Sequence, residues 1–168
     1  MNERPRIDLP HTVTDNVLEG AGSLITVLLW CYVVWFYPTL PAIVPIHFDG
    51  GGRPDGFGDK ASLLILPGIT TIIYILLTVL NRYPHTFNYL VEITPENAVK
   101  QYKNATKMIR VLKLGIALLF FIISYKTIDI AQGNDDGLGP WFLPAFIFGM
   151  LGTVGFFLWR GRDSPANV

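Results

Sequence analysis

Residues 44–60, VPIHFDGGGRPDGFGDK, concentrate a histidine, three aspartates, an arginine and a lysine in one short segment. His47 and Asp49 alternate along the chain, so in an extended conformation both side chains project from the same face. Asp55 or Asp59, returning across a turn, would supply a further oxygen ligand for zinc or a similar divalent ion. A structural zinc site normally has four protein ligands, and this segment has no cysteine and no second histidine. His47 and Asp49 are therefore weak metal candidates, and no metal is expected.

The same side chains also suit a structural network that holds the segment in shape. His47 can hydrogen-bond a carboxylate, and Asp55 can cap the Pro-Asp-Gly turn. Lys60 can pair with Asp49 or lie among lipid headgroups. The prolines and glycines predict turns around a short extended arm, IVPIHF. We expect a compact cap over the outer ends of the first two helices, with contact to a ligand or peptide as the second interpretation.

Catalytic motifs are missing from this sequence, which contains no G-x-S-x-G, no H-E-x-x-H and no paired histidines. No catalytic residue is assigned, and a metal-dependent membrane enzyme that uses His47 and Asp49 is an alternative. A transporter would need an ionisable residue deep within a span, whereas Lys113 and Lys126 are expected only at the ends of one. The other alternative is a small oligomeric transporter lined by Ser124, Thr70 and Thr71.

The composition points to a membrane protein. Of the 168 residues, 51% are hydrophobic and 15% are charged, whereas about a quarter are charged in soluble domains. A helix needs about 20 mostly apolar residues to cross a bilayer. Four segments satisfy this requirement: residues 20–37, 63–80, 111–130 and 138–159. We predict a single all-α membrane domain, residues 1–168, folded as a four-helix transmembrane bundle.

The fourth span carries two features of membrane helices. Trp141 and Trp159 lie near its ends, as the aromatic belts of membrane proteins predict. Gly149, Gly152 and Gly155 recur at every third position. Such a strip of small residues lets a neighbouring helix approach closely. We therefore expect the glycines to face another helix.

Lysine and arginine counts predict the orientation. The two terminal segments and residues 81–113 together hold ten basic residues, against three in the two other connections. Basic residues favour the cytoplasmic side. Both termini are therefore expected in the cytoplasm, with the cap, residues 38–60, facing outward.

Residues 81–113 predict a helix that continues into the third span. Thr94 suits an N-cap and Pro95 the first helical position, so one rod should run from about Pro95 to about Lys126. Four basic residues share one face of this rod, three or four positions apart: Lys100, Lys103, Lys107 and Arg110. They either contact anionic lipid or only set the topology.

The cap carries a recognisable pattern of residues. It consists of Leu40 and Pro41, then Pro45-x-His47-Phe48-Asp49, a glycine, and finally Pro54-Asp55-Gly56 and Lys60. This pattern, over about residues 30–67, resembles the family called domain of unknown function 1648. The family comprises bacterial integral membrane proteins and includes the N-terminal part of the Sdp-toxin immunity protein. In the family an asparagine is usual where this chain has Asp49, and the run of three glycines is longer here.

The resemblance implies a bacterial cytoplasmic (inner) membrane protein with several spans and no established reaction. We expect a non-enzymatic role in immunity or envelope-stress signalling through the outward-facing loop. The expected partners are the lipid bilayer and either an extracytoplasmic peptide or a membrane partner protein. A homo-oligomer stays open, and neither a nucleic acid nor a cofactor is expected.

Overall fold

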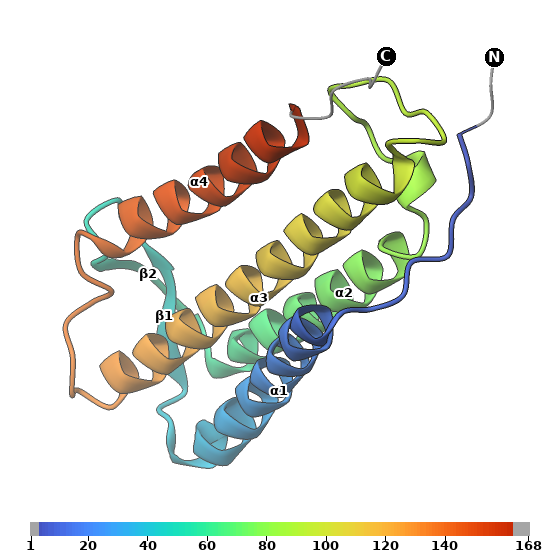
Figure 1. Cartoon of the computed structure of the whole chain (residues 1–168). Helices are drawn as coiled ribbons and strands as arrows, with labels where there is room; N and C mark the ends of the chain where they lie inside the picture. Colours follow the sequence, from blue (N-terminus) through green and yellow to red (C-terminus); the bar gives the residue numbers. More distant parts are fainter. Residues whose placement is uncertain (1–3, 163–168) are drawn as a thin grey trace.

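The computed structural model describes residues 4–162 and contains four long helices and one β-hairpin (Figure 1). The helices are α1 (Val13–Phe36), α2 (Ile65–Leu80), α3 (Ala98–Ala131) and α4 (Phe142–Arg162). The hairpin consists of β1 (Ile43–Phe48) and β2 (Pro54–Asp59). Short 3-10 helices lie at Tyr37–Thr39, Lys60–Leu64 and Pro84–Thr86. Each of the four long helices, counted with adjoining 3-10 turns, is long and apolar enough to cross a membrane.

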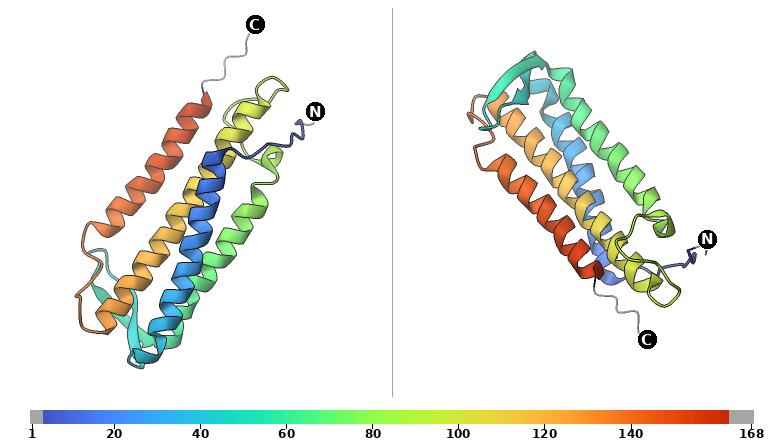
Figure 2. Two further views of the ribbon diagram at one scale, coloured as in Figure 1. Left: turned by 60° about the horizontal axis from the view of Figure 1, so that its bottom comes forward. Right: turned by 90° about the horizontal axis from the view of Figure 1, so that it is seen from above.

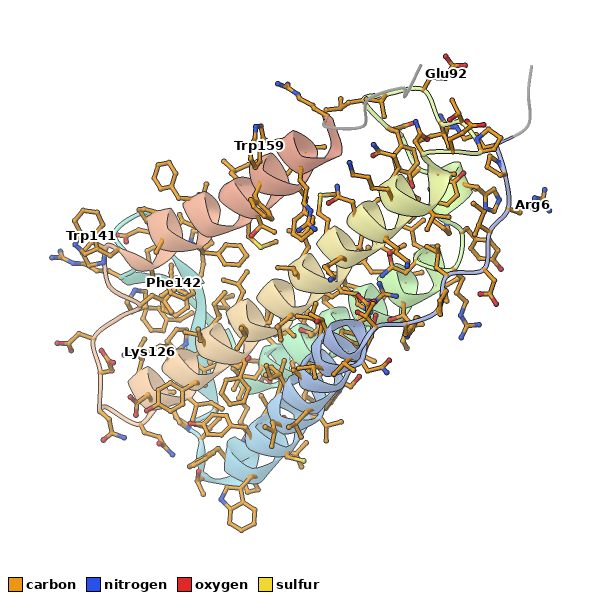
Figure 3. The ribbon with its side chains drawn as sticks, viewed as in Figure 1. Arg6, Glu92, Lys126, Trp141, Phe142 and Trp159 are labelled. Atoms are coloured by element: carbon orange, nitrogen blue, oxygen red, sulfur yellow. The ribbon has the colours of Figure 1, made fainter. Side chains whose placement is uncertain are left out.

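The arrangement places α3 at the centre, with α1 and α2 packed on one side and α4 on the other (Figure 2). The hairpin and the connecting loop 132–141 lie at one end of the bundle, which we call the hairpin end. Loop 81–97, the start of α1 and the end of α4 lie at the opposite end. Trp141 and Trp159 mark the two ends of α4, as the sequence predicts (Figure 3).

The first helix begins seven residues before the predicted span. Thr12 is its N-cap: the Thr12 hydroxyl accepts from the Asp15 N–H at 3.2 Å, and the Asp15 carboxylate accepts from the Thr12 N–H at 2.9 Å. This reciprocal capping box fixes the start of the helix. The predicted span 20–37 was therefore too short at its beginning, and the helix also carries Asp15 and Glu19.

The third helix confirms the predicted long rod, since it runs unbroken for 34 residues. It begins at Ala98, three residues after Pro95. Thr94 is not its side-chain cap. Instead, the Asn97 side-chain oxygen accepts from the Thr94 N–H at 3.0 Å, in the turn that precedes the helix.

The cap is a β-hairpin, so the prediction of an all-α fold was wrong at this point. The predicted arm IVPIHF is strand β1, which pairs antiparallel with β2. Pro54, Asp55 and Gly56 lie within β2 and do not form the predicted turn. Gly56 stands opposite His47, and a Cβ atom on this glycine would lie 2.9 Å from the Cβ of His47. The glycine therefore serves cross-strand packing.

The hairpin turn rests directly on the loop between α3 and α4. The Leu138 N–H donates to the Gly52 carbonyl oxygen at 2.7 Å. Gly52 has a φ of +77°, and a Cβ atom there would lie 2.6 Å from the Gly139 carbonyl oxygen. Only glycine allows both the left-handed conformation and this contact between backbones. The last glycine of the run in the cap thus has a structural reason.

The glycine strip of α4 does not face another helix in this chain. A Cβ atom added to Gly149, Gly152 or Gly155 would meet no atom within 4 Å among the described residues. Close packing of α3 and α4 occurs instead at Gly115, whose added Cβ would lie 3.0 Å from the Met150 sulfur. The predicted role of the strip within the bundle was therefore wrong.

Replacing Gly52 with alanine should destabilise the hairpin end. The left-handed backbone costs a non-glycine residue about 1–2 kcal/mol, and the contact with Gly139 would have to open. We expect a lower thermal unfolding midpoint for Gly52→Ala in detergent. Gly50→Ala is the matched control, since a Cβ there would meet no neighbour and its φ is not positive. Equal midpoints for the two variants would contradict this account of the turn.

Candidate functional site

The predicted motif residues form two separate hydrogen-bonded units in the hairpin. His47 on β1 and Asp55 on β2 pair across the strands, with 2.5 Å between Nδ1 and Oδ1. The Asp49 side chain accepts from the backbone N–H groups of Gly51 and Arg53, both at 2.8 Å. Asp49 therefore closes the turn, and His47 ties the strands together. These contacts support the structural interpretation of the motif.

Lys60 fastens the end of the hairpin to the end of the first helix. Its ammonium group donates to the carbonyl oxygens of Tyr37 and Leu40, both at 3.3 Å, and lies 4.9 Å from the centre of the Tyr37 ring. These carbonyls follow α1, where a helix leaves acceptors without intrahelical partners. Lys60 satisfies them and does not pair with Asp49 as the sequence suggested.

The structure brings no metal-binding cluster together among residues 4–162. No group of three or more histidine, cysteine, aspartate or glutamate side chains lies close enough to share an ion there. Asp49 and Asp59 each serve a local backbone turn, since the Asp59 side chain accepts from the Ala61 N–H at 2.7 Å. The three-ligand arrangement considered from the sequence is therefore not formed.

An apolar groove lies beneath the hairpin and is the main cavity of this end. Its volume is about 660 Å³, within the range of about 300–1,000 Å³ that is usual for small-molecule sites. The hairpin covers it, α3 forms its floor, and the beginnings of α2 and α4 form its walls. The floor residues are Leu119, Ile123 and Thr127.

Motif residues take part in this groove. Pro45 is buried and Phe48 half-buried, and both line the groove together with His47 and Asp49. Across from the hairpin stand four residues of α4: Phe142, Leu143, Phe146 and Ile147. Leu143 and Ile147 are partly exposed, as are Ile46 and Ile65 on the other walls. The groove is therefore open at its side, toward the surface that apolar helices present to lipid.

The loop under the hairpin is held by a second ion pair, between Lys126 of α3 and Asp135. The hydrogen bond from the Lys126 ammonium lowers the pKa of the Asp135 carboxyl, and the Asp136 and Gly137 N–H groups add to this effect. Asp135 is thus ionised at neutral pH. Its contribution to stability is fully present above the ordinary pKa of a carboxyl group and is lost as the pH falls from there through the lowered pKa of the folded protein.

Four ionisable side chains form a cluster at the opposite end of the bundle, which we call the ion cluster: Asp15, Glu19, Arg110 and Lys113. Glu19 links both cations, with 3.2 Å to the Arg110 Nε and 2.6 Å to the Lys113 Nζ. Arg110 also lies 3.3 Å from Asp15. Arg110 is 6% exposed and Lys113 only 2%. The sequence did not indicate that these four charged groups lie together, with both cations buried, at this end of the bundle.

Polar groups of α2 complete the surroundings of the ion cluster. Lys113 donates to the Thr78 hydroxyl at 2.7 Å and lies 4.3 Å from the centre of the Tyr74 ring. The Tyr74 hydroxyl donates to the Glu19 carbonyl at 2.7 Å. A Cβ atom on Gly22 would lie 2.7 Å from this ring, so glycine makes room for it. The cluster thus joins α1, α2 and α3 by charge-assisted hydrogen bonds.

The ion cluster also meets the segment before α1. The Arg110 guanidinium lies 3.1 Å from His11, and both line a polar cavity of about 310 Å³ beside Asp15 and Asn81. Arg4 donates to the Phe87 carbonyl at 2.6 Å and lies over the Tyr89 ring. Burial raises the pKa of the Tyr89 phenol. Residues 4–12 therefore lie against loop 81–97 and against the side of α3 that carries Arg110.

The predicted basic stripe divides into two groups. Lys100 and Lys103 are exposed and Lys107 half-buried, whereas Arg110 belongs to the ion cluster. Arg110 thus does not lie with the lysines on a lipid-facing surface, and its assignment to lipid contact was wrong. Ser124 and Thr70 are also buried inside the chain, and Thr71 accepts from Trp30 at 2.9 Å. These hydroxyls do not face outward to line a pore between copies.

Comparison with known proteins confirms the predicted resemblance. Residues 24–71 match the family described as "Domain of unknown function (DUF1648)". The match covers the second half of α1, the whole hairpin and the beginning of α2. The four apolar helices indicate a multi-pass membrane protein, and its residues 24–71 carry the match to this family.

An uncharacterized protein of Archaeoglobus fulgidus is 38% identical to this chain over 87 residues. The alignment covers 47% of this chain and 48% of that protein, so the chain spans about half the length of its relative. Because the relative is archaeal, sequences of this kind are not confined to bacteria. No solved structure matches the chain.

Removing the central carboxylate of the ion cluster should destabilise the bundle strongly. Glu19→Gln would leave Lys113 and Arg110 with too little negative charge, and breaking a buried ion pair costs about 3–5 kcal/mol. We expect a clear fall in the thermal unfolding midpoint, with partial recovery in the double variant Glu19→Gln/Lys113→Met. The matched control is Glu92→Gln at an exposed position. A Glu19→Gln protein as stable as this control would contradict a structural role for the cluster.

Proposed function

We propose that this chain is a non-enzymatic membrane protein that binds an apolar or amphipathic peptide in the groove beneath its hairpin. A role in immunity or envelope-stress signalling would use such a site, because both begin with recognition of a molecule at the outer face. The observation that carries the proposal is the groove itself. It is apolar, about 660 Å³ in volume and covered by the motif residues.

The lining of the groove favours an amphipathic ligand. Leu119, Phe146 and Ile147 offer apolar surface that a buried side chain or hydrocarbon segment would cover. His47 and Asp49 provide polar groups at the hairpin side, where a peptide backbone could form hydrogen bonds. The side opening between α2 and α4 would admit a ligand that is already in the membrane.

The proposed location is the cytoplasmic membrane, with both termini in the cytoplasm and the hairpin outside. The distribution of lysine and arginine supports this orientation. It places the groove in the outer leaflet and the ion cluster near the cytoplasmic surface. A secreted peptide would then reach the groove without crossing the bilayer.

The alternative of a metal-dependent enzyme draws less support from the geometry. The His47 Nδ1 is engaged by Asp55, and the Asp49 oxygen by two backbone N–H groups. Transport has one new observation in its favour, because the ion cluster buries two cationic side chains between the helices. All four groups are paired with one another, however, which fits a fixed structural role better than the uptake of an ion.

Filling the groove should abolish protection while the fold is kept. Leu119→Trp would place a large side chain on the floor of the groove. Leu118→Trp is the matched control, since Leu118 is the next residue and its side chain is exposed. Cells that express the protein would be challenged with secreted hydrophobic killing peptides. We expect the original protein and the control to restore growth, and Leu119→Trp to lose the effect.

A photo-crosslinking residue gives this test a direct readout. Placed at Ile147 in the groove it should label the peptide, whereas at Leu151, exposed on α4, it should not. Equal labelling at both positions, or protection by Leu119→Trp, would contradict binding in the groove. Growth protection without any crosslink at Ile147 would do the same.

Labelling of single cysteines would test the orientation. Cys31 is first replaced by serine, since it is exposed and is the one cysteine in the sequence. We expect Gly50→Cys in the hairpin turn to react with a membrane-impermeant maleimide on intact cells. Glu92→Cys in loop 81–97 should react only after the cells are opened. The reverse pattern would invert the proposed topology and place the groove in the inner leaflet.

A further inference from the structure

We infer that the end of the bundle opposite the hairpin holds a binding site for the headgroup of an anionic phospholipid. The site is a cleft of about 460 Å³ between the start of α1, the first turns of α3 and the end of α4. Four cationic side chains line it: Lys100, Lys103, Lys107 and Arg160. Because Arg160 comes from α4, the lysine stripe becomes one wall of a pocket between helices.

The charges of the cleft favour an anion. Two acidic residues, Asp15 and Glu96, also line it. The charge of Asp15 is already matched, because its carboxylate accepts from Thr12 and lies 3.3 Å from Arg110. Lys103, Lys107 and Arg160 therefore outnumber the one remaining carboxylate of the lining, that of Glu96. Basic pockets between transmembrane helices on the cytoplasmic side are typical sites for anionic lipid headgroups.

The depth of the cleft suits a headgroup. Counting back from Ala131 at the hairpin end of α3, about 20 residues cross the hydrocarbon core, which brings its inner edge close to residue 111. Lys107 lies about one turn beyond this edge and Lys103 about two turns beyond it. The rise of a helix separates Lys100 from Lys107 by about 10 Å. The lysines are therefore spread through the layer that lipid phosphates occupy.

The same face of α3 offers a place for the acyl chains. Leu118 and Ile122 continue the line of Lys107 toward the middle of the membrane, and both are more than 40% exposed. Val13 and Val17 at the start of α1 are also exposed. Cations in the headgroup layer, followed by exposed apolar residues, complement a whole phospholipid. A soluble phosphate would use only the cations.

Native mass spectrometry with added lipid can test the site. The purified protein would be titrated with dioleoyl-phosphatidylglycerol, with dioleoyl-phosphatidylcholine as the uncharged comparison. Each cation near a membrane surface contributes about fivefold in affinity. The triple variant Lys103→Gln/Lys107→Gln/Arg160→Gln should therefore bind phosphatidylglycerol about a hundredfold more weakly. The control Arg6→Gln/Arg53→Gln/Arg82→Gln removes the same charge from three exposed positions and should bind normally.

The outcomes distinguish a built site from a general effect of charge and from a site for soluble phosphate. Thermal unfolding midpoints of both triple variants must stay close to that of the original protein. Equal weakening in the two triple variants would show a general charge effect and overturn the site. Pyrophosphate is added in a separate arm. If it displaces phosphatidylglycerol from the original protein at equal concentration, the cleft selects a soluble phosphate and the lipid assignment is wrong.

Discussion

Two carboxylates and two cations inside an apolar bundle constrain how its first three helices fit together. Glu19 of α1 contacts both Arg110 and Lys113 of α3, and Lys113 also reaches Thr78 of α2. A buried charge that lost its partner would be costly, because nothing would then offset its desolvation. Sliding or rotating one helix would break several of these contacts together. The ion cluster therefore fixes the register of α1, α2 and α3.

The hairpin end depends on backbone contacts instead of buried charges. Gly52 of the hairpin turn meets Gly139 of loop 132–141, and Lys60 satisfies carbonyl groups after α1. The first contact connects the hairpin turn to a loop far from it in the sequence, and the second connects the end of the hairpin to the end of α1. Val44 of β1 packs into the core with Ile128 of α3, whereas the rest of β1 covers the groove. Family motif and groove are thus parts of the same arrangement.

The elements were easier to predict from the sequence than the contacts between them. Apolar runs identify four spans because the bilayer requires about 20 mostly apolar residues, although the third run, residues 111–130, includes charged residues near its ends. The start of α1 was missed because charged residues before the run resembled a loop. Thr12 and Asp15 have the spacing of a capping box and could have indicated the true start. With that start, Asp15 and Glu19 would have been placed on a spanning helix, one turn apart.

Other features of the site depend on tertiary structure. Local preference alone makes Pro-Asp-Gly a predicted turn. In the structure, Gly56 is instead required because the Cβ of His47 on the opposite strand leaves no room for a side chain. Only the position of α1 shows that Arg110 faces inward while Lys103, at helical spacing from it, faces outward.

The position of α4 connects the two ends of the molecule. This helix packs mainly on α3 and is held at each end by a few polar contacts. The Leu138–Gly52 hydrogen bond lies near its beginning. Near its other end, the Gln101 and Asn104 side chains donate to the carbonyls of Gly161 and Phe157, both at 2.8 Å. The same helix forms one wall of the groove and supplies Arg160 to the basic cleft. Contacts at both ends of α4 therefore shape the groove as well as the basic cleft.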